Sequence, residues 1–216
     1  MILLEKNNKE TGKEYAYRVL KENIMMLELK PGEIISELDL SNKLNISRTP
    51  IREVLMKLKG EHLINVKPQI GTFVSDIDEN LIEQAILMRV VLEKEIIKIA
   101  CNEFDEKYLI ELEKNLFAQK LLLKSENNTI EFHKLDRRFH KTIFEGCNKV
   151  DIWESIKRIS THYDRMRLLS DMQSNKEVLV SHHEILLNII KNKDIDNIDD
   201  YIYLHIVKPT ENWEIE

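Results

Sequence analysis

Apolar residues recur at helical spacing along most of this chain, and the clearest case is the stretch from Ser36 to Lys59. Its second half places four aliphatic residues at positions i, i+3, i+4 and i+7, namely Ile51, Val54, Leu55 and Leu58. This spacing is typical of a helix that buries one stripe against a core. The stretch therefore predicts two short helices joined by a tight turn.

Local signals around the turn support this prediction. Ser36 is followed three residues later by Asp39, a pattern close to the capping box that starts a helix. Ser47 is placed as the N-cap of the second helix, whose first turn tolerates Pro50 because the amides there have no partner within the helix. Asn45 lies between the two helices, and asparagine tolerates the positive φ that a sharp turn requires.

The polar start of the second helix points to nucleic acid. Arg48 and Arg52 are one turn apart and share a side, with Ser47 and Thr49 beside them. The chain then predicts a strand at 63–67, a turn and a strand at 72–75. Two helices followed by a β-hairpin form a winged helix, which lays its second helix in the major groove of DNA.

The rest of the chain predicts helices throughout. From Glu79 onward there is one glycine and one proline, and no alternation of apolar and polar residues marks a strand. We expect helices at 79–103, 106–124, 129–146, 150–169, 174–192 and 195–208, and short loops between six helices favour an antiparallel bundle. A further helix at 11–29 precedes the helix-turn-helix.

The predicted fold class is therefore mainly α, with two domains. Residues 1–78 form an N-terminal winged helix-turn-helix with a small β-hairpin wing. Residues 79–216 form an all-α six-helix antiparallel bundle. The connection contains no Gly/Ser-rich linker, so we expect a short join between the domains.

Charge is divided unevenly between the two parts. The net charge is −6, but residues 1–78 carry 12 basic and 12 acidic side chains, so the acidic excess lies after residue 78. DNA affinity would then depend on a local basic patch and on two copies of it. The candidates for this patch are Arg48, Arg52, Lys57, Lys59 and Lys67.

Composition argues for a protein of the cytoplasm. No basic stretch followed by an apolar run opens the chain, and no uninterrupted apolar segment approaches the roughly 18 residues of a membrane span. Cys101 and Cys147 are far apart and fit no CxxC pattern, which favours two reduced thiols over a disulfide or a metal site.

Several separated pieces, in order, resemble the GntR family of bacterial transcription regulators. They are Leu29-Lys30-Pro31-Gly32, Ser36-Glu37, the run from Ile46 to Leu55, and Gly71-Thr72-Phe73-Val74. The chain departs from the family pattern at Asn45 and His62, where glycine is usual, and at Ile70, where the wing is often basic. The resemblance implies binding to double-stranded DNA, with Lys67 and Gly71 as the contacts of the wing.

Four residues of the second half have the spacing of a metal site. Asp136 and His140 lie at i and i+4 on one helix, where they can bind the same ion. His183 and His205 are each eleven residues from Asp194, in the turn between the last two helices, so an antiparallel hairpin brings them to the same height. Three nitrogens and one oxygen suit zinc, nickel or another borderline divalent metal.

Two alternatives remain open for these ligands. The pair Asp136 and His140 alone is more often a hydrogen-bonded pair than a metal site. His182 competes with His183, although the spacing to His205 favours His183.

The second half also resembles the all-helical FCD ligand-binding domain of the FadR subfamily. The matching pieces are Arg89 to Glu93, Asp136 to His140, Asn148, and His183 followed by His205-Ile206. In that domain the aspartate and three histidines commonly hold a divalent metal, and a small organic acid often completes the coordination. The resemblance makes Arg89 a candidate for binding the carboxylate of the acid, whereas an ion pair with Glu93 at i+4 is the competing interpretation.

Together these patterns predict a ligand-responsive bacterial transcription regulator, most often a repressor in this family, and not an enzyme. Low net charge in the DNA-binding half demands a homodimer on a pseudo-palindromic operator. The competing hypotheses are a direct metal sensor, a metal-dependent hydrolase built on the same four ligands, and a metal that only stabilises the bundle.

Overall fold

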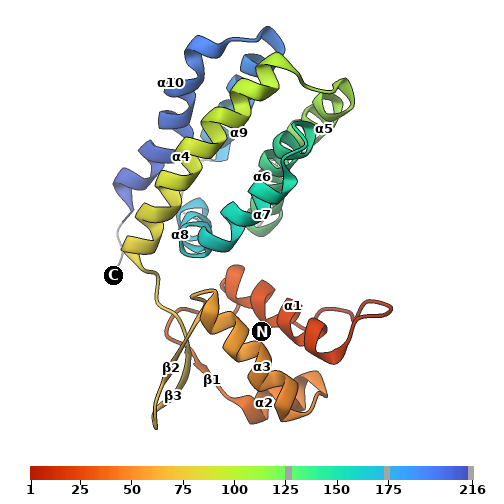
Figure 1. Ribbon diagram of the computed structural model, residues 1–216, viewed down its shortest axis with the longest axis vertical. Helices are drawn as coiled ribbons and strands as arrows, with labels where there is room; N and C mark the ends of the chain where they lie inside the picture. Colours follow the sequence, from red (N-terminus) through yellow and green to blue (C-terminus); the bar gives the residue numbers. More distant parts are fainter. Residues whose placement is uncertain (125–127, 173–175, 214–216) are drawn as a thin grey trace. The chain divides into compact units, whose positions relative to one another are not determined.

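The computed structural model of the protein describes residues 1–124, 128–172 and 176–213. The chain divides into two compact units, Met1–Asp78 and Glu79–Glu216. Helices dominate both units, and the first also contains a small antiparallel sheet (Figure 1). The predicted fold class, a mainly α chain with a winged helix-turn-helix and then a helical unit, is confirmed.

The first unit is built on three helices and three strands. They are α1 (Gly12–Met25), β1 (Ile34–Ile35), α2 (Glu37–Leu44), α3 (Arg48–Gly60), β2 (Ile64–Lys67) and β3 (Gly71–Val74). The predicted apolar stripe of α3 is buried, and it packs against α1. The sheet has the order β1-β3-β2, with Lys67 opposite Gly71 at the end of the hairpin.

The turn between α2 and α3 has the predicted conformation. Asn45 lies in the left-handed region with φ 54° and ψ 47°, and its N–H bonds back to the end of α2. His62, the second departure from glycine, also has a positive φ of 58°. Both residues therefore keep the backbone that glycine favours, at the cost of a strained conformation for a residue with a Cβ.

Three local details differ from the prediction. Ser36 caps α2 through a 3.2 Å bond from the Asp39 N–H to its hydroxyl, but Ser47 makes no side-chain cap bond. The helix expected at 11–29 ends at Met25 because Leu27 takes a positive φ of 60°. Strand β1 was not predicted, since two residues are too few to show a pattern.

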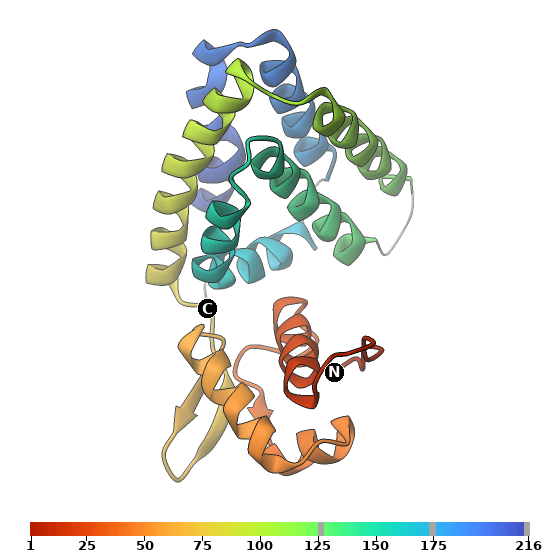
Figure 2. The same cartoon turned by 45° about the vertical axis from the view of Figure 1, so that its right-hand side comes forward.

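The second unit consists of helices wound around one apolar core. They are α4 (Glu79–Asn102), α5 (Glu106–Leu122), α6 (Thr129–Gly146), α7 (Val150–Ile159), α8 (Thr161–Asp171), α9 (Lys176–Asn192), η1 (Ile195–Asn197), α10 (Ile198–Ile202), η2 (Tyr203–Val207) and η3 (Lys208–Asn212). The long helix α4 packs against α6, α7, α8, α9 and α10, and α5 lies beside α6 (Figure 2). The core includes Phe132, Phe139, Phe144, Trp153, Leu186 and Ile206.

Two of the predicted helices are interrupted. The helix expected at 150–169 is divided at Ser160 into α7 and α8. Side chains on all sides of α8 are buried, so its sequence has no single apolar stripe that would reveal the break. The helix expected at 195–208 contains a π-helical turn at Tyr203–Val207. The loops expected near 125–128 and 170–175, and the start of the helix at 174–192, lie partly outside the described residues.

Candidate functional site

The start of α3 presents its arginines to solvent. The side chains of Arg48 and Arg52 are 56% and 61% exposed, and Ser47 and Thr49 beside them are also accessible. Glu37, on α2, accepts hydrogen bonds from Arg52 Nε at 2.7 Å and from Arg48 Nη2 at 3.3 Å. Both guanidinium groups are therefore held on the outer side of the helix-turn-helix, with further N–H donors free to bind a ligand.

The wing residues are also accessible. Lys67 is exposed at the end of β2, and its ammonium lies 5.1 Å from the centre of the Phe73 ring. Gly71 pairs with Lys67 across the hairpin. Ile70, at the tip, is exposed as well. The exposed side chains of the wing thus include the cation of Lys67 and the apolar side chain of Ile70.

The four predicted metal ligands lie together in the core of the second unit. Asp136 and His140 come from α6, His183 from α9 and His205 from the π-helical turn. All four are buried, and one donor atom from each lies within 4.8 Å of the others. Neighbouring ligand atoms around a first-row divalent ion are about 3 to 4 Å apart when its bonds are about 2.1 Å long. The half-buried His182 is not part of this group.

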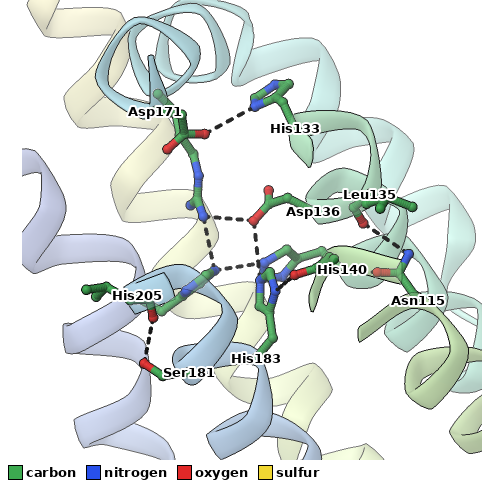
Figure 3. A network of polar contacts seen from close by, with 12 residues as sticks. Asn115, His133, Leu135, Asp136, His140, Asp171, Ser181, His183 and His205 are labelled. Carbon is green, nitrogen blue, oxygen red and sulfur yellow. Dashed lines mark hydrogen bonds and ion pairs between the residues drawn. The ribbon is translucent and has the colours of Figure 1, made fainter. Parts of the chain in front are cut away.

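A chain of hydrogen bonds fixes the tautomer of His183 (Figure 3). The Leu135 carbonyl can only accept, so Asn115 donates to it through Nδ2 at 3.1 Å. Asn115 Oδ1 then accepts from Gln119 Nε2 at 2.7 Å, and Gln119 Oε1 accepts from His183 Nδ1 at 2.7 Å. The proton of His183 is therefore on Nδ1, and the lone pair of its Nε2 faces Asp136 Oδ1 at 3.3 Å.

A second chain orients His140. Its Nδ1 lies 3.1 Å from Glu93 Oε2, and Glu93 Oε1 accepts a 2.6 Å hydrogen bond from Arg89 Nε. The Nε2 of His140 points toward the Nε2 of His205 at 2.8 Å. A carboxylate bonded to the outer nitrogen of a metal-binding histidine is a common device that orients the ring and raises its basicity.

Arg167 of α8 supplies a cation to the group. Its Nη2 donates to Asp136 Oδ1 at 2.9 Å and lies 3.4 Å from His205 Nε2. Its Nη1 donates to the Tyr163 hydroxyl at 3.2 Å. Arg89, which is only 4% exposed, stacks on the same Tyr163 ring with 4.6 Å between its Cζ and the ring centre. Both arginines thus lie against one tyrosine, beside the metal-ligand candidates.

The protonation states suit metal binding. Burial lowers the pKa of His183 to about 4, although Asp136 opposes that shift, and burial lowers the pKa of His205 well below its ordinary value. Burial alone would raise the pKa of Asp136, but the positive charge of Arg167 holds it well below its usual range. At neutral pH these two imidazoles are uncharged and the carboxylate is ionised, as metal ligands must be.

The donor set also passes a test of fit. His183 Nε2 is a buried nitrogen without a hydrogen-bond partner among the described residues, and it faces a carboxylate oxygen that also carries lone pairs. Two acceptors that face each other in a buried site require a proton or a cation between them. Three imidazole nitrogens and one carboxylate oxygen suit zinc or nickel.

A small cavity adjoins this group. Its volume is about 10 Å³, near the lower limit for one water molecule. The side chains that line it come mainly from α4, α6, α7 and α8. They include Arg89, His133, Asp136, Arg137, His140, Trp153, Lys157, Ser160, Asp164 and Arg167.

Both interpretations of Arg89 are therefore compatible with the structure, since it pairs with Glu93 and also lines the cavity. The sequence did not single out Arg167 and Gln119. Gln119 had a signal, because Asn115 and Gln119 share a helical face with the buried Leu112 and Leu116. Arg167 had none, since α8 shows no one-sided pattern.

The geometry defines a class: a winged helix-turn-helix DNA-binding unit joined to a helical unit with a buried polar site. Comparison with known proteins agrees. Residues 13–74 match the gntR family of bacterial regulatory proteins, and residues 84–208 match the FCD domain. The chain therefore belongs to the GntR family of DNA-binding transcription regulators and carries the FCD domain of its FadR subfamily.

Individual relatives extend over nearly the whole chain. The HTH-type transcriptional repressor RspR of Escherichia coli is 26% identical over 91% of this chain and 86% of its own. An uncharacterised HTH-type regulator of Streptomyces ambofaciens is 29% identical over 89% of this chain and 80% of its own. The structure of E. coli McbR/YncC is 20% identical, with a TM-score of 0.75, over 94% of this chain and 99% of that one. These relatives and this fold belong to transcription regulators, not to enzymes.

Residues 1–124, 128–172 and 176–213 contain no helix that is long and apolar enough to cross a membrane.

Proposed function

We propose that this protein is a ligand-responsive regulator in which residues 1–78 bind operator DNA and residues 79–216 bind a divalent metal and a small organic acid. Ser47, Arg48, Thr49 and Arg52 of the recognition helix contact base edges and phosphates, and Lys67 and Gly71 of the wing contact the backbone or the minor groove. The exposure of the two arginines and of Lys67 supports the assignment. The cytoplasm, where such DNA lies, is the expected location.

The protein acts as a homodimer on a pseudo-palindromic operator. One recognition helix covers only a few base pairs, and the DNA-binding half has no net charge to add non-specific affinity. Two helices related by a two-fold axis supply the missing contacts and match an inverted repeat in the DNA. The name of the relative RspR supports repression as the mode of action.

Asp136, His140, His183 and His205 hold the metal, zinc or nickel. The single observation that carries this assignment is the convergence of their four donor atoms within 4.8 Å, in a group whose outer hydrogen bonds leave lone pairs facing inward. When bound, the metal supplies a Lewis-acidic point for a carboxylate oxygen. Gln119 and Glu93 keep the rings of His183 and His140 in position.

Arg89 and Arg167 bind the carboxylate of the acid. Both lie beside the metal ligands and line the cavity, and a guanidinium forms strong paired hydrogen bonds with a carboxylate. To engage the acid, each arginine exchanges part of its contact with Glu93 or Asp136 for a contact with the ligand.

The cavity volume suggests how the acid changes the protein. A space of about 10 Å³ is too small for any organic acid, so binding requires the helices around it to separate. The acid therefore binds an opened arrangement of the bundle more tightly than the closed one, and shifts the population toward it. In a dimer, this shift changes the spacing between the two recognition helices and so the affinity for DNA.

Metal analysis tests this function directly. Purified protein should contain about one divalent ion per chain, and His183→Ala should lose it while keeping the helical circular dichroism spectrum. Wild type that contains no metal, and gains no thermal stability when zinc or nickel is added, would rule out the metal site.

The small cavity also favours a second candidate, a regulator that senses the metal itself. Four converging donors need no additional space to hold an ion, whereas an acid does. DNA binding that follows metal concentration in the absence of any acid would support this alternative. DNA binding that changes only when both are present would support the proposed acid effector.

A further inference from the structure

The two arginines at the start of α3 share one acidic partner. Glu37 opens α2 directly after its cap, and a single oxygen of its carboxylate, Oε2, accepts from Arg52 Nε at 2.7 Å and from Arg48 Nη2 at 3.3 Å. The side chain of Glu37 is 30% exposed, about half the exposure of the two side chains that it holds. The carboxylate therefore lies behind the two guanidinium groups, close to the surface proposed to meet DNA.

These contacts leave the outer end of Arg52 available. Arg52 donates to Glu37 through Nε, and within the described residues its two Nη groups make no hydrogen bond. The Nη pair is a fork that can donate to two acceptors at once, such as N7 and O6 of guanine in the major groove. The same fork also fits two oxygens of a phosphate. Shape alone therefore does not decide whether this arginine binds a base or the DNA backbone.

The charge of Glu37 distinguishes these two targets. The hydrogen bond from Arg52 lowers the pKa of the Glu37 carboxyl, so this group stays ionised at neutral pH. A phosphate that binds the Nη fork brings a full negative charge close to the carboxylate, and like charges repel. A base edge is neutral and experiences no such repulsion. Glu37 thus weakens the binding of the arginines to phosphates and leaves their binding to bases unopposed.

Glu37 also reduces the excess positive charge of this surface. Non-specific binding to DNA depends on cations that neutralise phosphates, and it is independent of sequence. The cluster combines the two positive charges of Arg48 and Arg52 with one negative charge, which leaves a net charge of +1. The pairing therefore lowers the affinity for DNA of arbitrary sequence, which competes with the operator for the protein.

We propose that Glu37 is a specificity-determining residue of DNA binding, which orients Arg48 and Arg52 toward base edges and repels phosphates from them. This inference rests on the proposed contacts of the two arginines with DNA and adds a role for their acidic partner. The effect of Glu37 is on the ratio between operator affinity and non-specific affinity.

Two variants separate the charge of Glu37 from its hydrogen bonds. Glu37→Gln keeps the length of the side chain and one carbonyl acceptor but removes the negative charge, and Glu37→Ala removes both. Asp39→Asn is the matched control, because Asp39 is the other acidic residue in the first turn of α2 and, in the described part of the chain, makes no ion pair with either arginine. It removes the same charge from the same end of the helix.

Fluorescence anisotropy would measure the affinity of the full-length protein for two duplexes over a range of salt concentrations. One is the sequence that the wild type enriches from a random DNA pool, and the other is a scrambled duplex of the same length and composition. Glu37→Gln should bind the scrambled duplex at least about twofold more tightly, with a steeper salt dependence. Its ratio of operator affinity to scrambled affinity should fall about tenfold, and Glu37→Ala should show a similar fall.

The control and the alternatives give distinct results. Asp39→Asn should keep the wild-type ratio within about threefold. Tighter binding of Glu37→Gln to the scrambled duplex would support the role of Glu37, since loss of folding weakens binding to every duplex. Unchanged or weaker binding to that duplex, a ratio unchanged in both Glu37 variants, or an equal fall in Asp39→Asn would overturn it.

The double variant Arg48→Ala, Arg52→Ala tests the premise separately. If it keeps the wild-type affinity for the operator, the proposed arginine contacts are wrong, and the inference about Glu37 is wrong with them. If its operator binding is weakened but Glu37→Gln keeps the wild-type ratio, the arginine contacts stand and only the inference about Glu37 is refuted.

Discussion

At the scale of single residues, the side chains of both candidate sites are held in position by hydrogen bonds from neighbouring polar residues. Glu37 binds both arginines of the recognition helix, Gln119 fixes the ring of His183, and Glu93 does the same for His140. In each case a polar side chain outside the contact surface sets the direction of a donor or a lone pair. Replacing a contacting residue should therefore remove a donor or a ligand atom, whereas replacing its partner should leave that atom present but no longer oriented.

The first prediction at this scale concerns Arg52, which we propose as a DNA contact. Arg52→Ala should weaken binding to a specific operator by about 1–3 kcal/mol, since it removes donors that can pair with a base edge. Gel retardation or fluorescence anisotropy at fixed salt would measure the change. Lys6→Ala, an exposed cation of the same unit, is the matched control. Unchanged binding by the Arg52 variant would show that this side chain does not contact DNA.

The second prediction concerns Gln119. Gln119→Leu keeps the approximate side-chain volume but removes the acceptor for His183 Nδ1–H, so the ring can turn and the tautomer is no longer fixed. Metal affinity should fall by about 10- to 100-fold, as for other outer-sphere partners of metal-binding histidines. Competition with a chromophoric chelator measures it, with the exposed Gln84→Leu as control. Equal affinity in both variants would contradict the role of Gln119.

At the scale of elements, the sequence predicted the features that depend on a regular spacing of residues or on a characteristic residue at a helix end. The stripe of α3, the capping of α2 by Ser36 and the left-handed Asn45 are all present in the structure. The clustering of Asp136, His140, His183 and His205 also followed from helical spacing and from the symmetry of a hairpin.

Other features of the helical unit have no such local pattern in the sequence. The break at Ser160 is hidden because α8 is buried on all sides, and the π-helical turn at Tyr203–Val207 changes the register without a glycine or proline to mark it. The contacts of Arg167 join α8 to α6 and to the π-helical turn, over 31 and 38 residues of sequence. Contacts at such separation depend on the packing of the bundle and not on a local pattern.

The prediction at the element scale tests the turn between α2 and α3. Asn45→Ala should lower the free energy of unfolding of the DNA-binding unit by about 1 kcal/mol, because alanine pays more than asparagine for a left-handed conformation. Asn45→Gly should be neutral or slightly stabilising, since glycine adopts φ 54° freely. Urea unfolding followed by circular dichroism compares the two. A glycine variant as unstable as the alanine variant would mean that the asparagine side chain, and not the backbone conformation, stabilises this turn.

At the scale of the whole molecule, the uneven charge has a consequence for assembly. The DNA-binding half is neutral overall, and the helical half carries the net charge of −6. A single copy would bind DNA weakly, and only two copies on adjacent half-sites give the affinity that a regulator needs. The proposed coupling between acid binding and DNA release also requires two recognition helices whose spacing can change.

Sedimentation provides the corresponding prediction. The protein should sediment with about twice the 25.6 kDa mass of one chain at micromolar concentration, and it should bind operator DNA as that dimer. A monomer that remains monomeric on operator DNA would remove the basis for a two-fold symmetric complex.

The proposed mechanism as a whole depends on paired recognition helices that read a symmetric DNA site, and selection from a random pool of DNA tests this without assuming any operator sequence. Purified wild-type protein should enrich one inverted repeat whose half-sites are about one helical turn apart, or a multiple of it. The double variant Arg48→Ala, Arg52→Ala should enrich none. An enriched site without two-fold symmetry, or the same enrichment by the double variant, would contradict this mechanism.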